Sequence, residues 1–300
     1  MKDSSISIIV PCYNSEKTIK QCIESIELSI SNYNNRIVYE LIVVDDGSTD
    51  QTAKLLQSIK NIQILTHKKN KGLSCARNSG VKASSHPLIA FIDSDILIDI
   101  NWFNNLLPSI EKNKNIIGVT GGLLSPQKSL TLLEKYLFSS YRGPGNISPN
   151  KPLKYKWFVF SNTIIKQKAL AKVGFFDEKI IFYGGEDTEL AIRIDKSFPG
   201  SLRQNSQGVG YHICNKSLKQ YLNNIFEYGL NNFIYIIKKH PSYKTDLGYN
   251  VISSFWGYFV FNSFTRILFL FFFLKLLRHP IIIKFLVVEA FVRGVRQSNN

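Results

Sequence analysis

The chain has 300 residues, of which 44% are hydrophobic, and a formal net charge of +15 at pH 7. This length allows one α/β domain with an appendage, and a core of this size is stable without disulfide bonds. The four scattered cysteines have no CxxC spacing, which argues against a zinc site and against a secreted disulfide framework. The charge predicts attraction to polyanions, but without a zinc-finger spacing, an RNP motif or a recognisable helix-turn-helix we expect no nucleic acid among the partners.

The first half of the chain alternates short aliphatic runs with amphipathic stretches, which predicts βαβ units and a mostly parallel sheet. The first aliphatic run is too short for the apolar segment of a signal peptide, so we expect the amino terminus to belong to the fold. Strands are predicted at residues 6–10, 41–44, 62–65 and 88–92, and helices at residues 19–30, 53–59 and 74–81.

Polar residues follow three of these predicted strands, namely Pro11 to Asn14, Asp45 with Asp46, and Asp93 with Asp95. In open α/β sheets, ligands bind at the carboxyl ends of the strands. The carboxylates of Asp93 and Asp95, one residue apart, are close enough to bind the same hard cation. Such pairs also occur as helix caps or in solvated turns. Asp45 and Asp46 fit either an ordinary turn or hydrogen bonds to a nucleotide.

After Gly121 the pattern loosens, and we interpret the middle region as an acceptor-side insertion. It contains a predicted helix at residues 130–138, a turn at residues 142–146 and an aromatic run at residues 157–160. Aromatic side chains of this kind either stack on a sugar ring or pack in the hydrophobic core. We favour the core for at least two of Trp157, Phe158 and Phe160. A final α/β portion then runs to about residue 198.

Six segments together resemble the family 2 glycosyltransferases of the GT-A fold. They are SIIVPCYN at 7–14, VVDDGSTD at 43–50, NKGLS with ARN at 70–78, DSD at 93–95, VGFFDE at 173–178 and GEDTEL at 185–190. Each motif is modest alone, but the set is specific and spans roughly residues 5–215. The resemblance implies an α/β fold of the GT-A type, with a Rossmann-like, mostly parallel central sheet flanked by helices.

The resemblance implies transfer of a sugar from a nucleoside diphosphate, usually UDP, to an acceptor hydroxyl, with inversion. The predicted donor site comprises Pro11, Tyr13, Glu16, Asp45, Asp46, Lys71, Gly72, Arg77, Asp93 and Ser94. Asp93 and Asp95 match the family's DXD element, and we expect Asp95, Asp93 and His212 to bind Mg2+ or Mn2+. A structural role for His212 is an equal alternative.

Glu186 and Asp187 match the family's acidic pair in the acceptor site. Attack on the anomeric carbon in a single displacement needs one base and no protein nucleophile, and we expect Asp187 to be that base, with Glu186 beside it. The alternative is that both acids merely favour a helix amino terminus.

Beyond His212 the composition changes, so we expect a catalytic domain at residues 1–215 and a helical region at residues 216–300. Residues 251–274 are apolar enough to span a bilayer, but Asn262 and Arg266 interrupt them. Basic residues and Pro280 follow. We favour helices that lie in the interface of an anionic leaflet, at the cytoplasmic face of the cell membrane, as a peripheral or monotopic attachment. A spanning helix and a buried cap or dimer contact stay open.

Such an attachment suits a glycan or polyprenyl-linked glycan acceptor in cell-surface polysaccharide or glycolipid assembly. A non-catalytic scaffold that binds nucleotide sugars is the alternative, and the presence of Asp93, Asp95 and Asp187 argues against it. A nucleotidyltransferase is disfavoured because its glycine-rich, lysine-containing opening is missing after the first strand. All of these predictions require Asp46, Asp95 and Asp187 to converge on one cleft.

Overall fold

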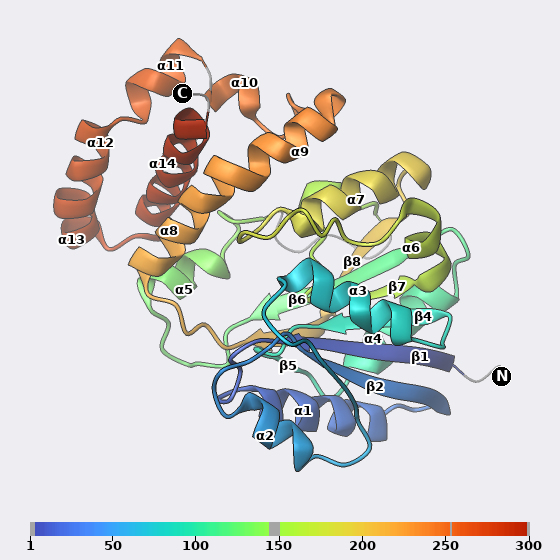
Figure 1. The fold of residues 1–300 in the computed structure, drawn as a ribbon. Helices are drawn as coiled ribbons and strands as arrows, with labels where there is room; N and C mark the ends of the chain where they lie inside the picture. Colours follow the sequence, from blue (N-terminus) through green and yellow to red (C-terminus); the bar gives the residue numbers. More distant parts are fainter. Residues whose placement is uncertain (1–3, 144–150, 253, 299–300) are drawn as a thin grey trace. The chain divides into compact units, whose positions relative to one another are not determined.

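The computed structural model describes residues 4–143, 151–252 and 254–298 (Figure 1). The chain forms two compact units. The sheet unit comprises Met1–Pro126, Asn146–Lys179 and Glu186–Cys214, and the helical unit comprises Gln127–Gly145, Ile180–Gly185 and Asn215–Asn300. Two segments that the sequence places in the catalytic domain, 127–145 and 180–185, therefore group with the helices. Pro144, Gly145 and Asn146 of the predicted turn lie outside the described residues.

The sheet unit is built on an eight-stranded sheet of order β3-β2-β1-β4-β7-β6-β8-β5. Its strands are β1 Ser4–Cys12, β2 Ile37–Asp45, β3 Gln63–Thr66, β4 Leu88–Ile92, β5 Ile96–Ile98, β6 Gly118–Leu124, β7 Asn162–Lys166 and β8 Leu202–His212. Strand β1 is parallel to β2 and β4, as β2 is to β3 and β6 is to β8. Strand β7 is antiparallel to β4 and β6, and β5 to β8. The predicted strands form the parallel half.

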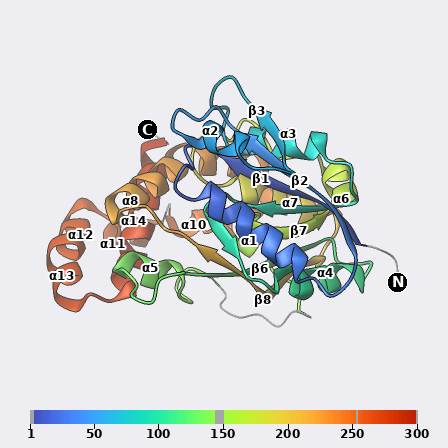
Figure 2. The same cartoon turned by 90° about the horizontal axis from the view of Figure 1, so that it is seen from below.

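Helices cover both faces of the sheet (Figures 1 and 2). They are α1 Ile19–Ser31, α2 Thr52–Gln57, α3 Leu73–Ala83, α4 Trp102–Glu111, α6 Gln167–Val173 and α7 Glu186–Ser197, with a 3-10 turn, η1, at Tyr155–Trp157. Alternate residues of β1 point to opposite faces. Ile8 and Val10 join the core beneath α1 and α4, whereas Ile9 meets Gly80 of α3 so closely that a Cβ there would overlap it. The amphipathic helices are thus held where the sequence predicts them.

The register of the parallel strands brings their carboxyl ends to one edge. Cys12 pairs with Asp45, and Ile9 pairs with Phe91 of β4. The pairing continues past the strand ends, because the Asp46 N–H donates to the Cys12 carbonyl at 2.9 Å and the His67 N–H donates to the Asp45 carbonyl at 2.9 Å. The polar residues that follow β1, β2 and β4 therefore share this edge, as predicted.

The aromatic run after the 3-10 turn is mostly core. Phe158 and Phe160 are buried and pack edge to face with each other at 5.1 Å between ring centroids, while Trp157 is exposed. This confirms the core role for two of the three aromatic residues. Glu189 and Arg193, four residues apart on α7, form an ion pair that is mostly buried. Glu189 is fully buried and accepts from the guanidinium, which also donates to the carbonyls of residues 173–175.

The described part of the helical unit consists of helices and turns without a strand. Its elements are α5 Leu132–Leu137, α8 Leu218–Glu227, η2 Tyr228–Phe233, α9 Ile234–Lys239, η3 Pro241–Tyr243, α10 Tyr249–Ile252, α11 Phe255–Val260, α12 Ser263–Leu268, η4 Phe269–Phe273, α13 Leu274–Leu277 and α14 Pro280–Ser298. A small core centred on Phe233, Ile237 and Val292 joins η2, α9 and α14. Glycines allow the backbones to meet, because a Cβ on Gly294 would overlap the Phe226 carbonyl.

The apolar stretch at residues 251–274 is divided among several short helices and does not form one long helix. Asn262 caps α12, since its side chain accepts from the Thr265 N–H at 3.0 Å. Among the residues described, none of the helices has both the length and the hydrophobicity that crossing a bilayer requires.

Candidate active site

The loops that follow β1 and β2 are tied together by hydrogen bonds. Asn14, which has a positive φ of 50°, accepts from the Thr49 N–H at 2.8 Å and donates its own N–H to Ser48 Oγ at 2.9 Å. Glu16 Oε2 accepts from the Gln51 N–H at 3.0 Å. Pro11 is buried in β1, and Tyr13 is exposed beside this junction. The predicted nucleoside-binding residues therefore sit on one braced pair of loops.

Asp45 and Asp46 bind nearby backbone, although in different ways. Asp45 Oδ1 accepts from the Ser48 N–H at 3.0 Å, which closes the turn at Gly47. Asp46 is buried and accepts from the N–H groups of Lys71 and Gly72 at 3.0 and 2.8 Å. It thereby fixes the loop that leads into α3, with Gly72 at a positive φ of 92° that favours glycine. The Lys71 side chain is exposed.

His67 joins this cluster, although the sequence analysis did not select it. Its Nδ1 lies 2.6 Å from Asp46 Oδ1, and its Nε2 lies 2.9 Å from Ser79 Oγ. The imidazole therefore links the carboxylate after β2 to helix α3. Its position directly after β3, at the ligand-binding edge, is the signal that would have identified it.

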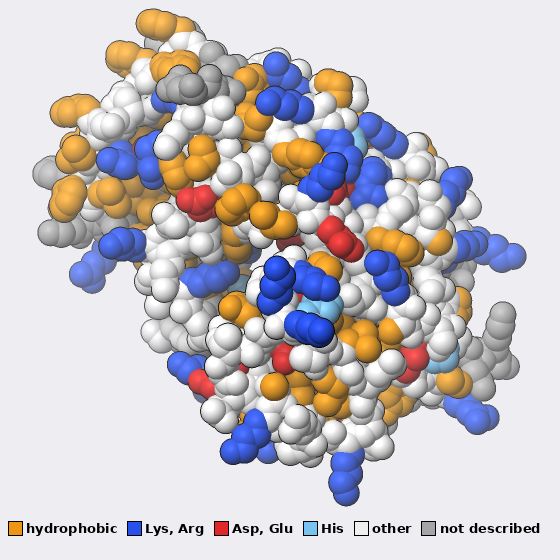
Figure 3. Space-filling view, in the orientation of Figure 1, with side chains coloured by type: hydrophobic (Ala, Val, Ile, Leu, Met, Phe, Trp, Pro, Cys, Tyr) orange, Lys and Arg blue, Asp and Glu red, His pale blue; other side chains and the backbone are white. Residues whose placement is uncertain are grey.

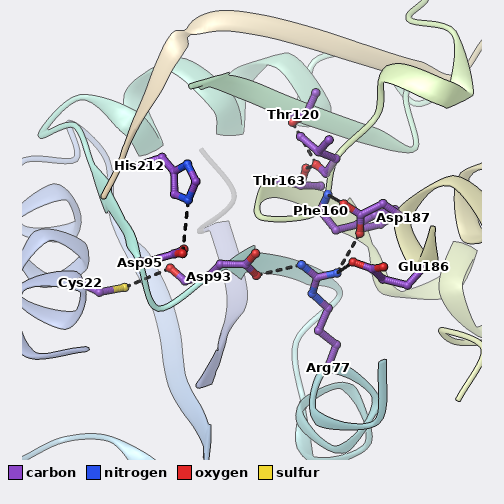
Figure 4. A network of polar contacts seen from close by, with 11 residues as sticks. Cys22, Arg77, Asp93, Asp95, Thr120, Phe160, Thr163, Glu186, Asp187 and His212 are labelled. Carbon is purple, nitrogen blue, oxygen red and sulfur yellow. Dashed lines mark hydrogen bonds and ion pairs between the residues drawn. The ribbon is translucent and has the colours of Figure 1, made fainter. Parts of the chain in front are cut away.

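The two carboxylates of Asp93-Ser94-Asp95, the predicted DXD element, point in different directions (Figure 4). Asp93 reaches toward Arg77, and its Oδ1 accepts from Nη2 at 2.8 Å. Asp95 points toward His212, with 3.3 Å between Oδ2 and Nε2. The intervening Ser94 lies 2.8 Å from Ser15, between the two Oγ atoms, so the DXD segment is also anchored to the loop after β1.

Arg77 is the centre of a buried ion-pair network (Figure 4). Only 1% of its surface is exposed, and its Nη1 donates to Asp187 Oδ1 at 2.8 Å while Nη2 serves Asp93. Glu186 Oε1 is 3.9 Å from Nη1. Burial opposes the charged form, but the three carboxylates together raise the pKa of Arg77 above its ordinary value. One guanidinium therefore fixes an acid from the DXD element and an acid from α7.

The acids around Arg77 outnumber it, which disfavours full ionisation. Burial first, and then the charge of Asp187, raise the pKa of Glu186 from 4.5 to about 7. Burial also raises the pKa of Asp93, although Arg77 partly opposes this. Asp187 Oδ2 accepts from the Phe160 N–H at 3.1 Å, so both of its oxygens are held while 20% of the side chain stays exposed. The site carries an excess of negative charge that a cation can offset.

Residues 7–174 match the family model described as glycosyl transferase family 2. The chain belongs to glycosyl transferase family 2. It is 32% identical over 252 residues to an uncharacterized glycosyltransferase of Rickettsia bellii, and the match covers 80% of this chain and 34% of that protein. It is 29% identical over 182 residues to a poly-beta-1,6-N-acetyl-D-glucosamine synthase of Staphylococcus epidermidis, covering 59% of this chain and 43% of that protein. The chain thus spans less than half the length of these relatives.

The fold of this family 2 chain also has a solved counterpart. Glucosyl-3-phosphoglycerate synthase from Mycobacterium tuberculosis, crystallised with Mn2+, UDP-glucose and glycerol 3-phosphate, gives a TM-score of 0.52 at 20% identity. The likeness covers 74% of this chain and 76% of that one. At this identity it shows the fold alone. The predicted family and the predicted α/β fold of the GT-A type are confirmed.

The family 2 chain has donor atoms that suit a divalent cation only in part. Among the described residues, no three or more His, Cys, Asp or Glu side chains are grouped to hold a metal ion. Asp95, whose side chain is 42% exposed, and His212 provide one carboxylate and one imidazole. Mg2+ is often bound by one or two carboxylates together with the phosphates of the substrate. The pair therefore fits a cation whose remaining ligands come from a bound diphosphate.

The predicted site residues of the family 2 chain fall into three groups along the same strand edge. Arg77, Asp93, Glu186 and Asp187 form one network, and Asp95 with His212 forms a second. The third comprises Pro11, Tyr13, Glu16, Asp45, Asp46, Lys71 and Gly72, and the contact of Ser94 with Ser15 joins it to the DXD segment. Like His67, Phe176 is not among the predicted site residues, and the centroid of its ring lies 5.1 Å from the Arg77 guanidinium.

Proposed function

We propose that this family 2 chain is a glycosyltransferase that moves a sugar from a UDP-linked donor to an acceptor hydroxyl, with inversion. The observation that carries the proposal is the shared guanidinium of Arg77. It holds Asp93 and Asp187 at 2.8 Å each, on the strand edge where ligands of open α/β sheets bind. A donor-side acid and an acceptor-side acid are thereby fixed relative to each other.

The donor is a nucleoside diphosphate sugar that binds along the loops after β1, β2 and β3. The braced loops carrying Tyr13, Glu16 and Asp46 support a nucleoside there, and the exposed ammonium of Lys71 adds positive charge for a diphosphate. The Mycobacterium tuberculosis enzyme was crystallised with UDP-glucose, and this supports uridine as the base.

The cation is Mg2+ or Mn2+, and Asp95 with His212 would hold it, with Asp93 nearby. The acid that reaches Arg77 is already engaged, so we assign the direct contact to Asp95. When bound, such a cation acts as a Lewis acid that stabilises the charge developing on the diphosphate. The presence of Mn2+ in the crystals of the Mycobacterium tuberculosis enzyme supports this assignment.

Asp187 takes the acceptor's proton in a single displacement. The acceptor oxygen forms a bond to the anomeric carbon while the bond from that carbon to the diphosphate oxygen breaks. The electron pair of the broken bond leaves with the nucleoside diphosphate, and the hydroxyl proton moves to the Asp187 carboxylate. Arg77 and the Phe160 N–H each occupy one lone pair of that carboxylate and fix its orientation, which leaves further lone pairs for the proton. One displacement inverts the anomeric centre.

The acceptor is a glycan or a polyprenyl-linked glycan of cell-surface polysaccharide or glycolipid assembly. The similarity to a poly-beta-1,6-N-acetyl-D-glucosamine synthase supports a growing glycan as the acceptor. The non-catalytic scaffold is disfavoured because a scaffold has no use for Asp187 held at an accessible position by Arg77 and a backbone N–H.

A donor panel tests the proposal. The full chain is incubated with UDP- and GDP-sugars and Mn2+ or Mg2+, and the released nucleoside diphosphate is measured. We expect release from at least one UDP-sugar that chelation of the metal abolishes. His212→Ala should raise the Mn2+ concentration needed by at least about tenfold. His86→Ala is the matched control, because His86 precedes β4 at the opposite strand end.

Two outcomes of the panel would count against parts of the proposal. Binding of a UDP-sugar by calorimetry without release under any condition would favour the scaffold. Release that is unaffected by chelation would remove the metal from the mechanism and leave His212 with a structural role.

A further inference from the structure

The helical unit exposes an unusual amount of apolar side chain on α11, α12, η4 and α13. Among the side chains described there, the five most exposed are between 66% and 76% accessible, namely Phe255, Phe259, Phe264, Phe271 and Leu276. We call these five side chains the apolar surface. In Figure 3, hydrophobic side chains gather over these helices at the upper left, with basic side chains beside them. Contiguous apolar patches on soluble proteins usually mark a site of interaction.

The charge of the same region selects the kind of partner. Residues 215–300 contain eleven Lys and Arg but only three Asp and Glu. Arg278 and Lys284, which flank the start of α14, are exposed. Lys275 also belongs to this basic segment, but its side chain lies outside the described part. A second copy of the chain would bring the same positive charge to the contact, whereas an anionic surface complements it.

Three arginines lie close to the apolar surface with a single acid between them. Glu289 is buried, and its Oε1 is 3.3 Å from Arg293 Nε. Burial raises the pKa of Glu289, and the nearby charges of Arg293, Arg266 and Arg296 only partly oppose this rise. The Arg296 guanidinium stacks on the ring of Tyr258 at 3.9 Å and donates to the Phe261 carbonyl. One carboxylate therefore faces three guanidiniums at the junction of α11, α12 and α14.

The positive charge of this arginine cluster is not fully matched by hydrogen bonds. Arg266 Nε and Arg296 Nη2 are both buried without a hydrogen-bond partner among the described residues. A buried guanidinium N–H without a partner costs free energy, and a phosphate oxygen is a strong acceptor for it. The excess of cationic donors beside exposed aromatic rings is the combination that phospholipid headgroups satisfy.

We propose that α11 to α13 dock on an anionic phospholipid bilayer. The apolar surface enters the acyl boundary, the exposed side chains of Arg278 and Lys284 bind headgroup phosphates, and the arginine cluster adds positive charge to the same region. Helices with bulky apolar residues and nearby Lys or Arg bind bilayer interfaces through apolar burial and attraction to anionic lipid. This contact is peripheral or monotopic. Resting on the proposed function, we assign it to the cytoplasmic face of the cell membrane, where the proposed polyprenyl-linked acceptor would lie.

Co-sedimentation with vesicles tests the proposal on the full chain. One set of vesicles contains phosphatidylglycerol and phosphatidylcholine in equal parts, and the other contains phosphatidylcholine alone. We expect binding to the mixed vesicles at low salt and at least about tenfold weaker binding to phosphatidylcholine. Replacing Phe264, Phe271 and Leu276 together by Ser should weaken binding by at least about tenfold.

Two further variants separate the contributions of apolar surface and charge. A double variant with Leu28→Ser and Ile100→Ser removes exposed apolar residues of the sheet unit and should bind like the wild type. A double variant with Arg278→Gln and Lys284→Gln changes only exposed cations and should lose most of the preference for phosphatidylglycerol. Circular dichroism of each variant confirms that it is folded.

Three results would overturn the proposal. The first is wild-type protein that stays in the supernatant with mixed vesicles at low salt. The second is equal binding by the folded triple Ser variant. The third is a wild-type protein that is dimeric in analytical ultracentrifugation and a triple variant that is monomeric, with no vesicle binding by either protein. The apolar surface would then be the contact between two copies.

Discussion

The sheet unit and the helical unit both bury charged groups, but with opposite excess. In the sheet unit, Asp93, Glu186 and Asp187 share the single guanidinium of Arg77. In the helical unit, three arginines share the carboxylate of Glu289. Buried charge without full compensation costs stability, and such groups concentrate at functional sites. The sign of the excess therefore agrees with the partners proposed above, a cation at the candidate active site and an anionic bilayer at the helices.

The two units also differ in how far they bury their apolar side chains. Strands β1, β2 and β4 bury their aliphatic side chains beneath helices, so that the exposed edge carries polar groups. Helices α11 to α13 instead leave phenyl rings in contact with solvent. This difference supports the proposals that the sheet unit binds a small polar substrate and that the helical unit docks on an extended surface.

The largest expected effect concerns the acid on the acceptor side. Asp187→Asn removes the proton acceptor but keeps an oxygen for the Phe160 N–H, so the site should stay folded. We expect kcat to fall by roughly two to four orders of magnitude with little change in donor affinity. Released nucleoside diphosphate and calorimetric donor binding measure the two quantities.

The matched control for this substitution lies further along the same helix. Asp195→Asn also removes a carboxylate from α7, but Asp195 is outside the Arg77 network, and the variant should keep near wild-type kcat. A fully active Asp187→Asn protein, or a greater loss from Glu186→Gln, would move the role of base to Glu186.

The next largest effect concerns Arg77, the cation that Asp93 and Asp187 share. Arg77→Met would leave buried carboxylates without their cation and should lower the free energy of unfolding by about 3 kcal/mol. Arg77→Lys keeps the charge but lacks the planar fork that reaches Asp93 and Asp187 together. We therefore expect the Lys variant to fold and to lose kcat more than donor affinity. Urea titrations and steady-state kinetics provide both measurements.

Arg193→Lys is the control for Arg77→Lys. Arg193 also binds a buried acid and backbone carbonyls, but it serves Glu189 and residues 173–175 and touches none of the catalytic acids. Its replacement should lower stability and leave kcat of the folded protein unchanged. Equal loss of kcat in both Lys variants would reduce Arg77 to a purely structural residue.

The parallel half of the fold was predictable, and the other half was not, for a physical reason. Strands β1 to β4 are short aliphatic runs, because parallel strands are buried on both faces. Strand β6 reads GVTGGLL, and its glycines suggest a turn. They are needed because a Cβ on Gly121 would overlap the Gly208 carbonyl of the adjacent strand β8. A requirement set by a neighbour far away in the chain leaves no local signal.

The same distinction applies to the site and to the carboxyl-terminal helices. The acids were identifiable because they follow strands or begin a helix, but nothing local shows that Arg77 is buried and binds two carboxylates. Asn262 looks like an interruption of an apolar span, and it is the residue that caps α12. A polar residue in an apolar run can interrupt one long helix or cap a short one, depending on where the backbone turns.

A smaller effect tests the packing of the helical unit. Gly294→Ala places a methyl group against the Phe226 carbonyl and 2.8 Å from the Leu230 amide nitrogen, both backbone atoms that cannot move aside cheaply. We expect a loss of about 1–3 kcal/mol in the free energy of unfolding, measured by urea denaturation. Gly143→Ala is the control, since a Cβ there has no neighbour within 4 Å among the described residues. Equal stability of the two variants would contradict the close approach of α14 to α8.

The smallest effect is the pH dependence that Glu186 gives to the sheet unit. Its pKa is 4.5 ordinarily and about 7 in the fold, so between these values the unfolded chain loses a proton that the folded chain keeps. Stability from this group is therefore lost as pH rises from 4.5 to 7. Glu186→Gln cannot ionise, so its stability relative to the wild type should grow across this window, by about 1–2 kcal/mol, and level off above it. Urea denaturation at pH 5, 6, 7 and 8 measures the difference. If the stability difference between Glu186→Gln and the wild type does not change with pH, Arg77 compensates the charge of Glu186 fully. The negative excess of the candidate active site would then be smaller than the positive excess of the helices.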